Sequence, residues 1–289
     1  MKRSLLLMLA AFVWPFVWAQ DASTEPGTVR TGFFLGISYS YLSIETELNG
    51  LTYQSVWFGQ DLGTVTLDDN ELDTLNQQTS EIFNRHQLAV EPGMVFLDNS
   101  RWHFEGSVLL GTSRVRFKTE IDQPEARQKT VTSDFKDLVG GISLNLRYNF
   151  SERWGLSLMP HFMYSWGNTE NVEDSIQPLV NFFVNDLKES FSLGYGRVNL
   201  MASYLAPNLV LSVGPGFYYS FISRTYTIDR TNPENMDQYH DQIESSLHSI
   251  AFIDACLRVD WTIIEPLTLS LEAAVGKDLF IKTGLRYHF

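Results

Sequence analysis

The amino-acid sequence predicts an all-β protein, specifically a transmembrane, antiparallel, up-and-down β-barrel. Three observations support this fold class. Apolar and polar residues alternate over long stretches, as in a strand with one apolar face. Beyond the N-terminal leader no apolar run reaches the roughly 18 residues of a spanning helix, and mean hydropathy is only -0.11. Short and long connections also follow one another in turn along the chain.

Ten strands are expected from the alternating stretches. They are Phe33–Ile44, His86–Leu97, Trp102–Lys118, Phe135–Phe150, Trp154–Trp166, Phe191–Tyr204, Leu209–Thr227, Leu247–Trp261, Leu267–Val275 and Leu279–Phe289. An even number brings both ends of the chain to one side, as bacterial single-chain barrels require. If two of the shorter stretches, such as Leu267–Val275 and a neighbour, were wrongly assigned, an eight-stranded barrel would be the alternative.

The connections between these strands fall into two classes. The short turns are Asp98–Ser100, Ser151–Arg153, Ala206–Asn208 and the segment around Glu265-Pro266, and the long connections are Glu45–Arg85, Thr119–Asp134, Gly167–Glu189 and Ile228–Ser246. The two classes alternate strictly until the short turn Gly276–Asp278. This separation by side is typical of barrels with tight periplasmic turns and longer extracellular loops.

The N-terminus has the features of a removed secretory signal. Lys2 and Arg3 precede an apolar run, and Val17-Trp18-Ala19 has the small-x-small form of a cleavage site. The apolar run of about a dozen residues is too short for a membrane anchor. We therefore expect a signal peptide over residues 1–19, a short periplasmic tail over 20–31 and a barrel over 32–289.

The last strand carries a resemblance to a known class. Leu279–Phe289 alternates apolar and polar residues and closes in Tyr287-His288-Phe289. It resembles the C-terminal signal by which the assembly machinery recognises bacterial outer-membrane β-barrels. The resemblance implies a small barrel of the porin-like, OmpW-like or omptin-sized kind, located in the outer membrane with its long loops outside the cell. It also implies that Tyr287 and Phe289 form the assembly signal and that the assembly machinery is a partner during biogenesis.

Aromatic residues gather at two levels of the expected strands, as at the two faces of a bilayer. On the short-turn side stand Phe96, Trp102, Phe150, Trp154, Tyr204, Trp261 and Phe289. On the opposite side stand Tyr39, Tyr41, Tyr164, Trp166, Tyr219 and Phe221. The outward positions between the two levels are mainly leucine and valine and should face lipid. Pro92, Pro160 and Pro215 share this outward register, and each removes one ladder donor.

The inward positions carry small residues and a balanced set of charges. We expect ten charged residues to line the pore or to form its charge network: Glu91, Glu105, Arg147, Arg197, Asp254, Arg258, Asp260, Glu272, Lys282 and Arg286. The acids and bases among them are equal in number. Because charges in a restricted interior must be paired or hydrated, the set permits either an ion-pair plug or a narrow aqueous passage.

These two interiors correspond to two functions. The preferred hypothesis is a monomeric barrel that passes small hydrophilic solutes or ions, and the alternative is a plugged structural or surface-interaction barrel. Ten strands leave too little space for a wide porin, which needs 16 to 18. Outer-membrane lipid is the expected surrounding partner in both cases. The sequence indicates no cofactor and no metal site.

The acidic residues gather in the first long connection. From Glu45 to Asn84 the acids are Glu45, Glu47, Asp61, Asp68, Asp69, Glu71, Asp73 and Glu81, with no lysine or arginine. This segment could attract cations or contact an extracellular partner, or it could be an ordinary solvated loop. The whole chain has a formal charge of -13, which argues against binding nucleic acid.

An enzyme of the omptin class is the third hypothesis, since those outer-membrane proteases are also ten-stranded. The resemblance would place Glu120 and Asp122 opposite Asp237, His240 and Asp241, but Glu120 stands where omptins have Asp and the spacings differ. No nucleophile elbow, zinc-binding His-Glu-x-x-His or phosphate-binding loop is present. We therefore expect no catalytic residues.

Overall fold

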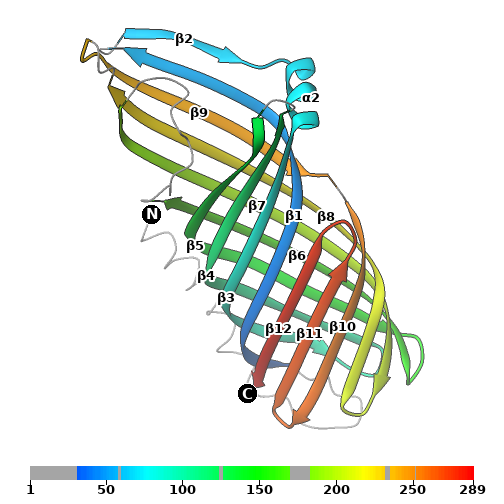
Figure 1. Ribbon diagram of the computed structural model, residues 1–289. Coiled ribbons are helices and arrows are strands. Elements are labelled where there is room, and N and C mark those ends of the chain that lie inside the picture. Colours follow the sequence, from blue (N-terminus) through cyan, green and yellow to red (C-terminus); the bar gives the residue numbers. More distant parts are fainter. Residues whose placement is uncertain (1–30, 58–59, 124–125, 170–182, 232–234, 251) are drawn as a thin grey trace.

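The computed structural model describes residues 31–57, 60–123, 126–169, 183–231, 235–250 and 252–289 of the chain. These residues form an elongated antiparallel β-barrel (Figure 1), which confirms the expected fold class. The elements are β1 (Gly32–Trp57), β2 (Gln60–Thr66), α2 (Asp69–Gln78), β3 (Thr79–Asp98), β4 (Trp102–Gln123), β5 (Ala126–Asn149), β6 (Trp154–Thr169), β7 (Phe183–Ala206), β8 (Leu209–Thr231), β9 (Gln238–Ser249), β10 (Ile253–Ile264), β11 (Leu267–Val275) and β12 (Leu279–His288). The expected signal peptide and all but the last residue of the expected tail lie outside the described residues.

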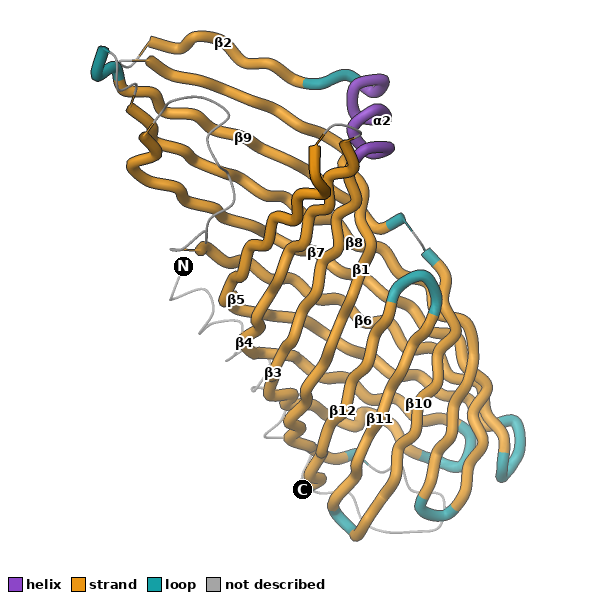
Figure 2. The backbone as a smooth tube through the Cα atoms, viewed as in Figure 1, coloured by secondary structure: helices purple, strands orange, loops and turns teal. Residues whose placement is uncertain are grey.

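The barrel has a different number of strands at its two ends. Near the C-terminus, the ring closes through β1, β3, β4, β5, β6, β7, β8, β10, β11 and β12, which are the ten strands expected. At the other end, which we call the distal end, β9 pairs with both β8 and β1. The described ring there closes through eight strands, β1 and β3 to β9. Figure 2 shows β9 beyond the tip of the β11–β12 hairpin, where this change occurs.

The step from ten strands to eight is held together at the hairpin tip. Asp278 accepts a hydrogen bond from the backbone N–H of Glu45 at 3.0 Å and one from the Tyr218 hydroxyl at 2.5 Å. Lys277 pairs with the Glu45 carboxylate at 3.2 Å, and the N–H of Ile250 donates to the Glu45 carbonyl at 3.3 Å. Burial raises the pKa of the Asp278 carboxyl. These contacts connect the end of the hairpin to β1 at the point where β9 begins to pair with it.

Several of the expected boundaries between strands and connections are wrong. The expected strand Leu247–Trp261 is divided between β9 and β10, and the expected long connection Glu45–Arg85 contains the end of β1, all of β2 and α2, and the start of β3. Thr119–Asp134 is likewise largely strand. Outside a bilayer a strand has no lipid to face, so the strands within the two expected connections lack the apolar outward positions that identify the others.

The outer wall between the two aromatic levels is apolar. Of the outward residues, Leu88 is 59 % exposed, Val213 57 % and Leu257 44 %. Rings at the C-terminal level lie in pairs across neighbouring strands, such as Trp102 with Tyr148 at 4.7 Å and Trp154 with Tyr204 at 5.2 Å. This is the apolar band with aromatic borders that a bilayer requires of a barrel. The one helix of the described chain, α2, is too short and too polar to span a membrane.

The three outward prolines each coincide with a gap in one ladder. The β3–β4 pairing is interrupted beside Pro92, the β5–β6 pairing beside Pro160 and the β7–β8 pairing beside Pro215. Pairing continues on the other side of each proline. The missing donor is therefore accommodated by a local break that does not shift the register.

Candidate functional site

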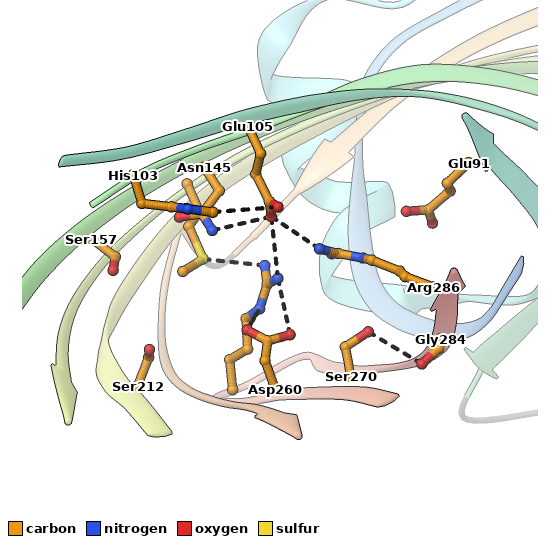
Figure 3. Close-up of polar contacts among 12 residues, drawn as sticks. Glu91, His103, Glu105, Asn145, Ser157, Ser212, Asp260, Ser270, Gly284 and Arg286 are labelled. Atoms are coloured by element: carbon orange, nitrogen blue, oxygen red, sulfur yellow. Dashed lines mark hydrogen bonds and ion pairs between the residues drawn. The ribbon is translucent and has the colours of Figure 1, made fainter. Parts of the chain in front are cut away.

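The interior of the ten-stranded part is occupied by a connected network of charged side chains. Its centre is Glu105 on β4, whose carboxylate accepts a hydrogen bond from Arg286 at 2.9 Å and lies 3.8 Å from Arg258. Asn145 donates to the same oxygen at 3.2 Å, and His103 lies 3.4 Å from the other. Figure 3 shows Arg286, Asn145 and His103 converging on Glu105.

Arg258 extends the network towards the C-terminal end. Its guanidinium makes two contacts with Asp260, at 2.8 and 3.1 Å, which is the two-pronged geometry of a strong arginine–carboxylate pair. Since residues 258 and 260 point to the same face of β10, the pair forms along one strand. Arg147, on β5, donates to Asn149 at 3.2 Å.

A second group of charges lies beside the closing strand. Lys282 on β12 pairs with Glu91 on β3 at 2.6 Å, and the Ser38 hydroxyl donates to the same carboxylate. Glu91 is 3 % exposed. A lysine and a glutamate from strands on either side of β1 therefore meet inside the barrel.

A third group is built around Arg197 on β7. Its guanidinium pairs with Asp254 at 2.8 Å, donates to Asn199 at 2.7 Å and lies 2.7 Å from the Cys256 sulfur. Asn199 in turn donates to Glu272 at 2.9 Å. All ten charged residues expected inside the barrel therefore take part in ion pairs or hydrogen bonds, although the sequence could not specify which residues pair.

Little free space remains between these groups. The cavity they enclose has a volume of about 30 Å3, which corresponds to one or two water molecules. It is lined by Ser143, Met159, His161, Arg197, Asn199, Arg258, Ser270, Glu272, Phe280, Lys282 and Arg286. The side chains that line this cavity therefore leave little free space between them.

The eight-stranded part is closed by a different set of side chains. Its interior is an apolar cluster whose innermost members are Ile44, Phe83, Val115, Phe117, Phe191, Leu193, Ile222 and Leu247, all at most 4 % exposed. Phe117 packs edge-on against Phe83 at 5.2 Å and against Phe191 at 5.8 Å between ring centroids. Eight strands leave an interior just wide enough for side chains to fill, so this ring forms a packed core.

The polarity of the wall reverses at the distal aromatic level. On the bilayer side apolar residues face outward and charges face inward, whereas beyond that level the apolar cluster faces inward and Arg114, Arg116 and Lys136 are exposed on the outside. Such a reversal is expected where the surroundings of a barrel change from lipid to water. The outward side chains change accordingly, and apolar side chains fill the narrowed interior.

Two buried ion pairs within this distal core are not among the expected site residues. Arg224 pairs with Glu189 at 2.8 Å and lies over the Phe117 ring at 4.1 Å. Arg85 lies 3.8 Å from Asp137 and donates to Ser113 at 2.9 Å. Arg85 and Glu189 fall in the expected long connections, where no inward positions are expected. Arg85 shares the inward register of Phe83, and Glu189 shares the inward register of Phe191. This alternation is the signal that could have identified the two residues.

The two residues of the expected assembly signal lie on the outside of the barrel. Tyr287 and Phe289 are exposed, and their rings make an edge contact at 5.1 Å between centroids. The N–H of Phe289 donates to the carbonyl of Phe33 at 2.9 Å, which connects the last residue to the first strand.

The described side chains include only Asp237, His240 and Asp241 of the expected omptin-like set. His240 binds Asp229 at 2.6 Å and lies opposite Val56 of β1. Asp241 accepts hydrogen bonds from Tyr53 and Ser55. The side chains of Glu120 and Asp122 lie outside the described residues. Over the side chains that are described, no group of three or more metal-ligating residues is positioned to hold a metal.

Comparison with known proteins reveals likeness in structure only. No protein-family model matches the chain, and no curated protein sequence matches it. Similar solved structures include the outer membrane protein OprG from Pseudomonas aeruginosa, with 9 % identity and a TM-score of 0.38 over 92 % of this chain and 100 % of that one. The outer membrane protease OmpT from Escherichia coli has 12 % identity and a TM-score of 0.43 over 93 % and 99 %. The toluene transporter TbuX from Ralstonia pickettii has 10 % identity and a TM-score of 0.34 over 91 % of each chain.

Proposed function

We propose that this chain is an outer-membrane barrel with a closed lumen, and that it functions through the structure it holds beyond the membrane. The single observation that supports this is the double filling of the interior, by paired charges in the ten-stranded part and by the apolar cluster in the eight-stranded part. This reverses the order of the two hypotheses from sequence.

The paired charges and the packed aromatic side chains oppose the passage of a solute through the barrel. A solute crossing the ten-stranded part would have to separate buried pairs such as Arg286 with Glu105 and Lys282 with Glu91. Breaking a buried pair costs about 3–5 kcal/mol when one partner is left uncompensated. A second barrier of packed aromatic side chains follows at the distal ring.

The functional surface in this proposal is the distal platform, which we define as β1 from Thr46 onward, β2, α2 and β9. β2 is exposed along its whole length and pairs, among the described strands, with β1. Asp69 and Glu71 occupy the first turn of α2, where the helix dipole favours negative charge. The platform is therefore acidic and accessible, and it suits a basic partner at the cell surface.

The location in the cell belongs to the same proposal. The leader, the side-specific turns and the apolar band with aromatic borders all support outer-membrane insertion with the platform on the extracellular side. We propose a monomer surrounded by outer-membrane lipid and inserted by the β-barrel assembly machinery through Tyr287 and Phe289.

The narrow channel remains the second candidate. The observation that favours it is the polar lining of the 30 Å3 cavity, to which Lys282 and Arg286 contribute charged side chains. Ions could pass only if these side chains moved out of their pairs and the distal cluster opened as well.

Binding of a polycation tests the platform. The wild-type barrel in a neutral detergent should bind fluorescent poly-lysine, and Asp69→Asn with Asp73→Asn should weaken binding about fivefold, at roughly 0.5 kcal/mol for each exposed charge. The matched control is Glu152→Gln with Glu265→Gln, which removes two exposed acids from the C-terminal end. Equal weakening by both pairs, or no binding by the wild type, would contradict a dedicated acidic platform.

A further inference from the structure

The distal platform has an open strand at its edge. β2 pairs with β1 from Thr52 opposite Thr66 to Trp57 opposite Gln60, and among the described strands it has no second neighbour. Figure 1 shows β2 as the outermost strand of the platform, with β1 and then β9 beside it. All seven of its residues are exposed. The backbone along the outer side of β2 is therefore an edge to which another strand can add.

The pattern of pairing with β1 shows which backbone groups of β2 point outward. The N–H of Leu67 donates to the carbonyl of Leu51 at 3.1 Å, so these two residues form a hydrogen-bonded pair. In an antiparallel ladder such pairs alternate with pairs whose N–H and C=O groups point away from each other. Thr66 opposite Thr52 is a pair of the second type, and two residues away Thr64 belongs to another. Thr64 and Thr66 therefore direct their N–H and C=O groups to the open edge.

A bulge protects only one end of this edge. Leu62 is left out of the register with β1, and Gly63 beside it has a φ of 120°. The N–H of Gly63 donates to the Asp61 carboxylate at 2.9 Å. Bulges and charged side chains are the usual protection of an edge strand against further pairing. The other end, Thr64–Thr66, is regularly paired with β1 and contains neither proline nor a charged residue, so it lacks this protection.

The charge around the edge identifies the kind of strand that would add. Five acids lie in β2, in the turn after it and in α2, namely Asp61, Asp68, Asp69, Glu71 and Asp73. None of them forms an ion pair with a described basic side chain. Asp61 accepts a hydrogen bond from Gln54 at 3.1 Å, and Asp68 and Glu71 each accept one from the other's backbone N–H at 3.0 Å. A second copy of the chain would bring the same acids to this edge, whereas a cationic segment is complementary to them.

We propose that β2 binds an extended cationic segment of a partner protein, which adds to the open edge as a further β-strand. The proposal rests on the acidic platform of the proposed function and specifies how that platform holds its partner. Backbone groups of Thr64 and Thr66 supply ladder hydrogen bonds, and lysine or arginine side chains of the added strand neutralise the five acids. Val65, which is 57 % exposed, offers an apolar contact on the opposite face of β2 from the two threonines.

The first experiment compares peptides and requires no variant. Fluorescence anisotropy would measure binding of a short labelled peptide that alternates lysine with threonine to the full-length chain in a neutral detergent. Two further peptides carry N-methyl groups on one or the other set of alternate residues, which keeps the charge and removes half of the ladder donors. Methylation of the set that faces β2 should weaken binding about 20-fold, equivalent to two hydrogen bonds. Methylation of the other set should have little effect.

A pair of variants at one position tests the edge itself. Thr66→Pro removes an outward N–H and keeps the bonds to β1, because an edge strand tolerates proline where its N–H faces solvent. It should weaken binding of the unmethylated peptide about fivefold, equivalent to one hydrogen bond. The matched control Thr66→Val keeps the backbone donor and should leave binding unchanged. Heat-modifiable migration in gels shows that both variants are folded.

Three results would overturn the proposal. Equal binding of all three peptides, weakened by Asp69→Asn with Asp73→Asn, would exclude strand addition and leave the acidic platform of the proposed function intact. Absence of binding by every peptide would overturn the platform as well. Dimerisation of the wild-type chain that Thr66→Pro abolishes would assign the open edge to a second copy.

Discussion

At the scale of single residues, Glu105 is the centre of the charge network in the lumen. Its carboxylate contacts Arg286 on β12, Arg258 on β10, Asn145 on β5 and His103 on its own strand, β4. The side chain of Arg258 is 8 % exposed, and that of Arg286 is 14 % exposed. Removing the negative charge would leave two cations without their shared acceptor.

Glu105→Gln should therefore lower the free energy of unfolding by about 3–5 kcal/mol, the usual cost of leaving a buried charge uncompensated. Urea titration of the barrel in lipid vesicles would measure it. Glu152→Gln, in an exposed turn, should change stability by less than about 0.5 kcal/mol. Equal stability of the two variants would show that the network is hydrated and contributes little.

Cys256 reports on the state of the lumen without any mutation. It is the single cysteine of the chain, its residue is 1 % exposed, and its sulfur lies against Arg197. In the closed barrel a water-soluble maleimide should fail to label it, whereas urea-unfolded protein should be labelled completely. Fast labelling of the folded protein would indicate a lumen open to water.

The charged residues also show what sequence can and cannot predict at this scale. Alternation identified Glu91, Arg197 and Arg258 as inward because a strand has a period of two. It could not specify that Lys282 meets Glu91 across β1, since that contact depends on register between strands distant in sequence. Arg224 lay within an expected strand, but the Phe117 ring against which it lies comes from β4, and that contact depends on how distant strands pack.

At the scale of elements, the distal ring depends on the junction at β9 and β10. The alternating pattern continues through Leu247–Trp261, so the sequence predicted one strand there, but the short β11–β12 hairpin leaves room for β9 to pair with β1. Hairpin length is visible in the sequence. The effect of hairpin length on the number of strands in the ring is not visible in the sequence, because that effect depends on where the hairpin ends relative to β1 and β8.

Phe117→Ala tests the distal core. The ring is 1 % exposed and contacts Phe83, Phe191 and Arg224, so its loss should lower the free energy of unfolding by about 3–5 kcal/mol. Thermal unfolding followed by heat-modifiable migration would measure the change. Val65→Ala, on exposed β2, is the control and should be nearly neutral. A small effect of Phe117→Ala would mean that the distal interior is loosely packed.

At the scale of the whole molecule, the fold was predictable to a greater extent than the state of the interior. The apolar outward face of the strands is a property of the sequence alone, so the ten-stranded barrel followed from it. Whether the balanced charges surround water or pair with one another depends on the radius of the barrel at each level. That radius changes where ten strands become eight. The alternation of residues in the sequence does not reveal that change in radius. The channel was the preferred hypothesis from sequence because nothing there indicated that the interior narrows.

The closed lumen is tested most directly by conductance. Folded, heat-modifiable wild-type protein should be inserted into planar lipid bilayers and compared with a known porin and with protein-free membranes. The paired charges around Glu105 and the apolar cluster around Phe117 predict no current above the protein-free background at moderate voltage. Discrete, reproducible conductance steps from the wild-type protein, altered in ion selectivity by Arg258→Ala or Glu272→Ala, would contradict the closed barrel and favour the narrow channel.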